Sequence, residues 1–234
     1  MPSRLTALTV DVCDPARAAR FWADFLGREQ VVVPDGVLVP GSETQLGLRF
    51  VPTGVPRAGR DRMHLHLNST DPADQRRTVA TALRLGASHL DVGQLPEERH
   101  VVLADPEGDE LCVIEPGTSF LAGCGFLAEL TCEGSRDVGF FWAEALGWPV
   151  VWDDGPQTAI QSPHGGTKIS WDGPPSPRRG RSRQRFDLVL VGDDRADETA
   201  RLTALGATTL GVLPDGAAEQ QDPDGNEFLL RVPT

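Results

Sequence analysis

A set of motifs occurs twice along the chain, and this duplication restricts the fold more than any other feature of the sequence. RFWADFLG at residues 20–27 returns as FFWAEALG at 140–147, 120 residues later. LRLGA at 83–87 returns as TALGA at 203–207, and DPEGDEL at 105–111 returns as DPDGNEF at 222–228, 117 residues later. Three motifs in one order at nearly constant spacing indicate a tandem duplication. The turn-like residues 116–119 separate the copies, so we predict domains at 1–117 and 118–234.

Each predicted domain contains two helices separated by short strands. Asp14 and Pro15 are typical of a helix start, and Gly27 is typical of a helix end. Asp71 and Gly86 bound the second helix in the same way, and Ser135, Gly147, Asp194 and Gly206 bound the two helices of the second copy. This order predicts an α+β fold whose helices cover one face of a sheet, while the other face meets solvent, a second sheet or a cavity.

The segment RMHLHLN, residues 62–68, is predicted to be a strand beside that cavity. Residues two apart on a strand point to the same side, so His64, His66 and Asn68 share one face. Leu65 and Leu67 share the other face, which we expect to pack against a helix. The two histidines are either a polar cavity wall or chemically active groups.

Composition excludes several classes of partner. The formal charge of −12 argues against nucleic acid and anionic membrane surfaces, which require excess Lys and Arg. The sequence has no apolar run of membrane-spanning length and its N-terminus does not resemble a signal peptide. Its four cysteines lack metal-binding CxxC spacing, which favours reduced thiols in a cytoplasmic protein.

The motif order resembles the vicinal oxygen chelate (VOC) superfamily, which includes glyoxalase I, bleomycin-resistance proteins, fosfomycin-resistance enzymes and extradiol dioxygenases. The FW…LG helix and the DPEGDELCV segment are most similar to the actinobacterial glyoxalase-like domain branch. The resemblance covers both halves. It implies two tandem VOC domains, each built of paired βαβββ modules that form a cup-shaped mixed sheet with helices outside.

The resemblance also implies positions for a metal, which we transfer residue by residue. Metal-using relatives place ligands on the first strand, on the strand before the second helix and on the strand after DPxG. The matching residues are Ala7, His64 and Cys112 in the first half, and Leu127, Arg185 and Leu229 in the second. Alanine, leucine and arginine supply no ligand atom for a cation. We therefore expect no cofactor, while His64, His66 and Cys112 remain an alternative site for Zn, Ni, Mn or Fe.

Other polar residues are candidates for ligand contacts. Asp11 is expected to face the first cavity, either as a general base or paired with an arginine such as Arg62. Glu129 is expected to face the second cavity, and Arg185 and Asp187 are expected to form a local salt bridge there. The arginine-rich run 177–185 is either a solvated loop or a basic patch near a cavity mouth. We assign only turn formation to the two DPxG motifs.

Three functions are compatible with these residues. The first is binding of a small organic molecule, such as a metabolite or antibiotic, without the usual metal triad. The second is a metal-dependent lyase, isomerase or dioxygenase that uses His64, and a metal-free variant would use His64, His66 or Asp11 as acid or base. In the ligand site we expect Cys112, Asn68, Glu129, Arg185 and Asp187. The third function, a protein-interaction module, has no positive feature, and we expect a monomer or a homodimer.

Overall fold

A computed structural model describes residues 3–55, 57, 59–177, 181–192 and 194–233. The first half contains β1 (Arg4–Val12), α1 (Pro15–Leu26), β2 (Val31–Val33), β3 (Gly36–Val39), β4 (Gly47–Pro52), β5 (Met63–Leu67), α2 (Pro72–Leu85), β6 (Ser88–His89), β7 (Val101–Ala104) and β8 (Glu110–Val113). A short 3-10 helix, η1 (Ser119–Leu121), follows. The second half contains β9 (Leu127–Cys132), α3 (Arg136–Leu146), β10 (Val150–Asp154), β11 (Gln157–Gln161), β12 (Lys168–Trp171), β13 (Gln184–Val189), α4 (Arg195–Leu205), β14 (Thr208–Val212), β15 (Ala218–Gln221) and β16 (Glu227–Arg231).

The helices begin and end at the residues that the sequence predicts. Asp14 accepts a hydrogen bond from the backbone N–H of Arg17, and Pro15 follows as the first helical residue. Asp71, Ser135 and Asp194 cap the other helices in the same way. Each α-helix ends at a glycine with positive φ, namely Gly27, Gly86, Gly147 and Gly206. The local boundaries therefore follow from capping chemistry.

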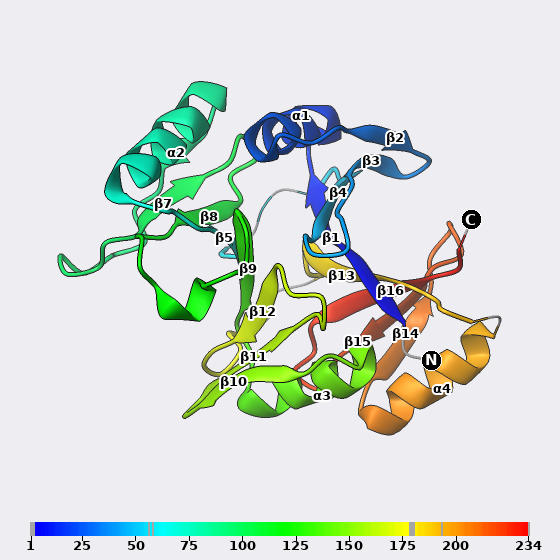
Figure 1. Cartoon of the computed structure of the whole chain (residues 1–234). Helices are drawn as coiled ribbons and strands as arrows, with labels where there is room; N and C mark the ends of the chain where they lie inside the picture. The colour runs from blue at the N-terminus through cyan, green and yellow to red at the C-terminus, as the bar shows by residue number, and fades with distance from the viewer. Residues whose placement is uncertain (1–2, 56, 58, 178–180, 193, 234) are drawn as a thin grey trace.

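The described chain forms two eight-stranded sheets, and each sheet contains strands from both halves (Figure 1). Sheet A has the order β14-β15-β16-β13-β1-β4-β3-β2, and sheet B has the order β10-β11-β12-β9-β5-β8-β7-β6. The antiparallel pairs β1–β13 and β5–β9 join the halves. The α+β fold of paired βαβββ modules is confirmed. The prediction that β1 and β5 line one cavity is wrong, because these strands belong to different sheets.

The two modules of each half are connected through the repeated motifs. The indole N–H of Trp22 in α1 donates to Asp105 in the DPEG turn at 2.9 Å, and Trp142 in α3 donates to Asp222 at 3.1 Å. Both tryptophans are buried, as predicted. The helices of each half consequently lie side by side, α1 with α2 and α3 with α4, at opposite ends of the molecule (Figure 1).

The two DPxG turns differ at one buried position. In the second half, the Asn226 amide donates to the Asp222 carboxylate at 3.1 Å. In the first half, Asp109 takes the place of Asn226, so two buried carboxyl groups, Asp105 and Asp109, lie close together. Burial, and then the charge of Asp105, raises the pKa of Asp109 well above its usual value. The nearest guanidinium nitrogens, of Arg183 and Arg57, lie at 3.6 and 3.8 Å, which is beyond hydrogen-bond distance.

We predict that Asp109→Asn stabilises the protein at neutral pH. A carboxyl group with a raised folded-state pKa contributes stability below the unfolded pKa, and this contribution is lost as pH rises toward the folded value. The advantage of the variant should therefore grow between about pH 4 and about pH 7, to about 1 kcal/mol or more in free energy of unfolding. Urea titrations at several pH values measure it.

The matched control is Asn226→Asp, which places a second carboxyl group beside Asp222. This change should lower the free energy of unfolding as pH rises. Equal pH dependence of Asp109→Asn and the unaltered protein would contradict the interpretation.

Candidate functional site

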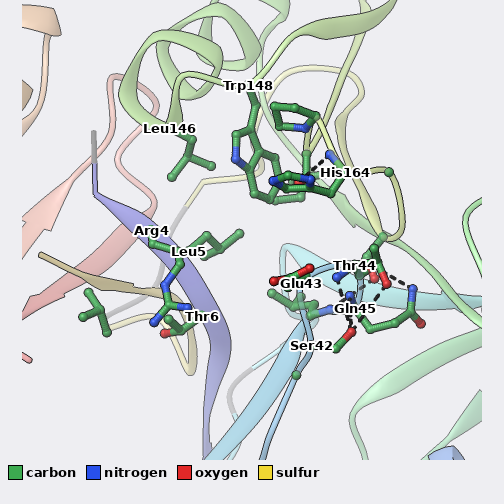
Figure 2. Close-up of a pocket in the computed structure, with 18 of the residues that line it drawn as sticks. Arg4, Leu5, Thr6, Ser42, Glu43, Thr44, Gln45, Leu146, Trp148 and His164 are labelled. Atoms are coloured by element: carbon green, nitrogen blue, oxygen red, sulfur yellow. Dashed lines mark hydrogen bonds between the residues drawn. The ribbon is translucent and has the colours of Figure 1, made fainter. Parts of the chain in front are cut away.

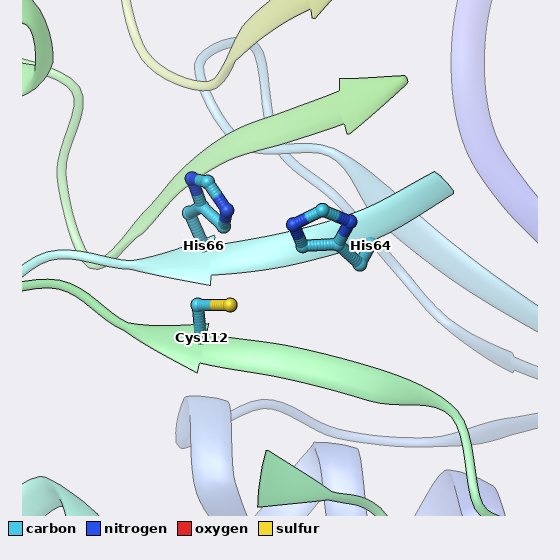
Figure 3. Close-up of side chains that lie close together, drawn as sticks. All are labelled: His64, His66 and Cys112. Carbon is cyan, nitrogen blue, oxygen red and sulfur yellow. The ribbon is translucent and has the colours of Figure 1, made fainter. Parts of the chain in front are cut away.

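The two histidines lie on β5, at the centre of sheet B. Met63, Leu65 and Leu67 are buried toward the helices, while His64 and His66 point to the opposite face and are half-buried (Figure 3). The predicted alternation of this strand is therefore confirmed. In register with His66 are Glu129 on β9 and Cys112 on β8. These side chains come from three different strands and from both halves of the chain.

His66 is held in place by a buried carboxylate. Its Nδ1 lies 2.7 Å from Oε2 of Glu129, and the hydroxyl of Ser170 on β12 donates to Oε1 of the same carboxylate. An anionic acceptor at Nδ1 favours a proton on that nitrogen, so in the neutral form of the ring the lone pair is on Nε2. No partner for Nε2 is recorded among the described residues. The set Ser170–Glu129–His66 therefore presents an oriented imidazole on the polar face.

The regular antiparallel register of β5 and β9 places Glu129 opposite His66, and a bulge in β9 lies directly beside this pair. His66 pairs with Glu129 whereas the next residue, Leu67, pairs with Leu127, so Ala128 is an extra residue in β9. Leu127 is buried in the core as a result. The prediction that Glu129 faces a separate second cavity is therefore wrong, because Glu129 and His66 line the same cavity. The error arose because the repeat spacing contains no information on which strands of the two copies pair.

His64 and Cys112 lie beside His66 and are uncharged in the folded protein. Burial, followed by the charges of His66, Arg60 and His100, lowers the pKa of His64 to about 3. Burial, followed by the charges of Glu110 and Glu129, raises the pKa of Cys112 to about 12. His64 is therefore a neutral imidazole, and Cys112 is a protonated thiol, at physiological pH. Neither one is an effective free acid, base or nucleophile.

His64, His66 and Cys112 form a group with suitable chemistry for a metal ion (Figure 3). One ligand atom from each lies within 4.8 Å of the others. In a tetrahedral zinc site such atoms are roughly 3.3–3.8 Å apart, so side-chain movements of about 1 Å would suffice. Two neutral imidazoles and a sulfur favour a borderline-soft ion such as zinc. The residues therefore fit a divalent cation, provided that Cys112 gives up its proton.

A cavity of about 360 Å³ extends from His66 across the polar face of sheet B. Phe120 of η1 and Trp152 of β10 form one wall, with ring centroids 5.4 Å apart in an edge-to-face arrangement. Glu115 and His100 also line the cavity. Asn68 follows the end of β5, and its side-chain amide lies 3.4 Å from the carbonyl of Leu121, next to Phe120. The cavity thus combines aromatic surface with polar groups, as small-molecule sites usually do.

On sheet A, charged pairs occupy the corresponding face. Asp187 is fully buried and accepts hydrogen bonds from Nε of Arg49 at 2.7 Å and from Nε of Arg231 at 2.8 Å. Both arginines also pair with Asp35, at 2.8 and 3.0 Å. A hollow of about 290 Å³ remains nearby, with Arg231 in its wall. This face is therefore dominated by fixed charges that neutralise one another.

The ion pairs of sheet A differ from the predicted ones. Arg185 pairs with Asp11 through both of its terminal nitrogens, one at 2.9 Å, and does not pair with Asp187. Arg62, the expected partner of Asp11, instead donates to the side chain of Asn226 at 3.0 Å. Arg185 and Asp187 share a face of β13, but Arg185 pairs with Asp11 on β1 and Asp187 pairs with Arg49 on β4. Asp11 is thus remote from the His66 cavity, on the other sheet.

The arginine-rich run lies only partly within the described residues. Arg178, Arg179 and Gly180 are outside them. Arg181 pairs with Glu219 at 2.8 Å, and Arg183 donates to the backbone carbonyl of Asp11 at 2.8 Å. Arg181 is therefore paired with an acidic side chain, whereas Arg183 is held mainly by a backbone carbonyl of the same chain.

The comparisons with known proteins agree with this geometry. The sequence pattern of the glyoxalase-like domain family matches residues 7–114 and again 128–231. The chain belongs to this family. It is thereby a VOC protein with two tandem glyoxalase-like domains, although its place in the actinobacterial branch stays a prediction. The exact boundary at residue 117, the cytoplasmic location and the oligomeric state also remain predictions.

Solved structures share the fold over almost the whole chain. Glyoxalase I from Zea mays superposes with a TM-score of 0.64 at 16% identity, covering 97% of this chain and 92% of the maize chain. A putative dioxygenase from Bacillus subtilis gives a TM-score of 0.65 at 15% identity, covering 99% and 85%. No curated protein gives a significant match. At such low identity these neighbours establish the architecture and leave the activity open.

The ligand positions that the family resemblance implies give an incomplete set of metal ligands. Ala7, Leu127 and Leu229 of this glyoxalase-like protein are buried and carry no metal-binding atom, so the family positions supply only His64 and Cys112.

Within the described ranges, no helix has the length and apolarity to cross a bilayer.

We predict that Asp187→Ala is strongly destabilising. Removing a fully buried carboxylate leaves two guanidinium groups short of a partner, which should lower the free energy of unfolding by about 3 kcal/mol. Chemical denaturation measures this loss. The matched control is Asp215→Ala, because Asp215 also pairs with Arg231 but is 31% exposed, and its loss should amount to less than about 1 kcal/mol. Similar losses in the two variants would contradict the prediction.

Proposed function

We propose that this glyoxalase-like protein binds a small organic molecule in the cavity of sheet B. The observation that carries the proposal is the contrast between the two sheets. The polar face of sheet A is taken up by Asp187 and its arginines, whereas that of sheet B has a cavity of about 360 Å³ with aromatic walls and an oriented imidazole. Trp152 and Phe120 would contact a flat, apolar part of the ligand, and His66 would hydrogen-bond its polar part.

The His66–Glu129 contact supports a second candidate function, proton transfer to or from the bound molecule. Of the predicted acid–base residues, His66 best combines a cavity position with an orienting partner. Glu129 would stabilise the imidazolium formed when Nε2 takes a proton, and Ser170 would keep the carboxylate in place. His64 is less suited because its lowered pKa makes it a weak base, and Asp11 is less suited because Arg185 binds it on the other sheet.

Binding in the sheet B cavity can be tested by a search for ligands. Candidate aromatic metabolites and antibiotics are screened by the shift in melting temperature, and each hit is titrated by calorimetry. Trp152→Ala should weaken binding by about tenfold or more, because a large aromatic contact is lost. Glu129→Gln should weaken it as well, since His66 loses its ionic partner.

Phe140→Ala is the matched control, because Phe140 is also a partly exposed aromatic residue but lies outside this cavity. Its binding should equal that of the unaltered protein. A ligand whose affinity falls equally in Phe140→Ala and Trp152→Ala, or in neither, would argue against the sheet B cavity. For a ligand that turns over, His66→Gln should lower kcat while leaving the melting temperature nearly unchanged.

The group His64, His66 and Cys112 supports metal-dependent chemistry as a variant of the same site. A divalent ion held there would polarise a carbonyl or enolate oxygen of the ligand. The two imidazoles and the sulfur would hold the ion, and Glu129 would orient His66. Because Cys112 must lose a proton that it otherwise holds up to a pKa of about 12, metal affinity should rise with pH.

The metal-dependent variant predicts that metal-supplemented expression yields protein with about one equivalent of zinc per chain. Cys112→Ser should reduce this content severalfold, and chelation should lower the melting temperature of the unaltered protein but not of the variant. The control is Cys124→Ser, a second buried cysteine outside the group, which should retain the metal. Elemental analysis decides the matter: absence of metal in the unaltered protein, or equal content in the two variants, would contradict the metal site.

A further inference from the structure

A second hollow lies between the two sheets, and neither His64 nor His66 lines it. It has a volume of about 760 Å³, roughly twice that of the sheet B cavity. The start of β1 lies on one side, the β3–β4 loop lies on a second, and the α3–β10 and β11–β12 loops lie on a third (Figure 2). Both halves of the chain therefore contribute to this groove, and none of the groups discussed for the sheet B site lines it.

The wall between the two loops is held in a fixed shape. The backbone N–H of Thr167 donates to the carbonyl of Thr44 at 2.8 Å, and the N–H of Leu46 donates to the hydroxyl of Thr167 at 3.2 Å. Gly166, with a φ of +93°, lets the loops approach so closely that an added Cβ would lie 1.5 Å from the carbonyl oxygen of Thr44. This wall is thus formed before any ligand arrives, which lowers the entropic cost of binding.

The floor and one side of the groove are apolar or aromatic. Leu5, Leu146 and Ile169 are buried at its base. The half-buried ring of Trp148 and the imidazole of His164 lie along the same side (Figure 2). A flat ring system placed there would gain apolar contact below and stacking contact at the side.

Two opposite charges line the groove without a side-chain partner in the described chain. Arg4 comes from β1 and Glu43 from the β3–β4 loop, and both are exposed side chains at the edge of the hollow (Figure 2). Neither side chain has a recorded hydrogen bond or ion pair within the described chain, in contrast to the nearby Arg49, which pairs with Asp35 and Asp187. An anion alone would be attracted by Arg4 and repelled by Glu43, and a cation alone would meet the reverse. A molecule that carries both charges satisfies the two groups.

We propose that this groove binds a flat aromatic zwitterion of the aromatic amino acid class. Its ring lies against Trp148 and His164, its carboxylate pairs with Arg4, and its ammonium group pairs with Glu43. The site is independent of the one proposed on sheet B, because it uses other side chains and the opposite ends of the strands.

L-tryptophan is the probe, and the indole N–H signals of ¹⁵N-labelled protein are the readout. Trp148→Phe assigns the Trp148 signal and Trp152→Phe assigns that of Trp152. Titration should shift the Trp148 signal saturably and leave the Trp152 signal in place. Arg4→Ala and Glu43→Ala should each weaken binding by about fivefold or more, as expected for charge-assisted contacts. Indole-3-propionate and tryptamine, which each carry one charge, should bind more weakly than L-tryptophan.

Control variants separate this site from the sheet B cavity. His66→Gln and Glu129→Gln should bind L-tryptophan as tightly as the unaltered protein. An unmoved Trp148 signal, affinity unchanged in Arg4→Ala and Glu43→Ala, or a shift confined to Trp152 would overturn the proposal. None of these results would affect the sheet B site, whose own test depends on Trp152 and Glu129.

Discussion

The antiparallel pairing of β5 with β9 is the contact on which the candidate site depends. It places the central strand of one half against the first strand of the other, and β1–β13 does the same in sheet A. Since β5 carries His66, β9 carries Glu129 and β12 carries Ser170, the oriented imidazole exists only when the two halves are joined. The two copies are therefore not independent domains, because each sheet contains strands from both copies.

The two sheets balance a buried carboxylate in different ways. On sheet A, the position next to Ala7 carries Asp187, whose charge is balanced by Arg49 and Arg231. Burying such a charge has a large desolvation cost that only a complete set of partners offsets. On sheet B, the carboxylate of Glu129 is balanced by hydrogen bonds from a histidine and a serine. That smaller set leaves one ring nitrogen and a cavity available to a ligand.

Burial decides the protonation states around this site. His64 lies two residues from His66 on one strand, and burial lowers the pKa of His64 to about 3. The same burial raises the pKa of Cys112 to about 12. A neutral imidazole and a protonated thiol form an uncharged patch that tolerates an apolar ligand. They also become metal ligands once the thiol is deprotonated.

The sequence by itself determined the local structure and the family. Helix ends follow from side-chain caps at Asp14 and Asp71 and from glycines such as Gly27, and the alternation of β5 follows from strand geometry, so these features depend only on neighbouring residues. The tertiary structure alone decided which strands pair across the halves. It placed Glu129 beside His66 and Asp11 beside Arg185, because strand register and the reach of long side chains depend on contacts between residues far apart in sequence.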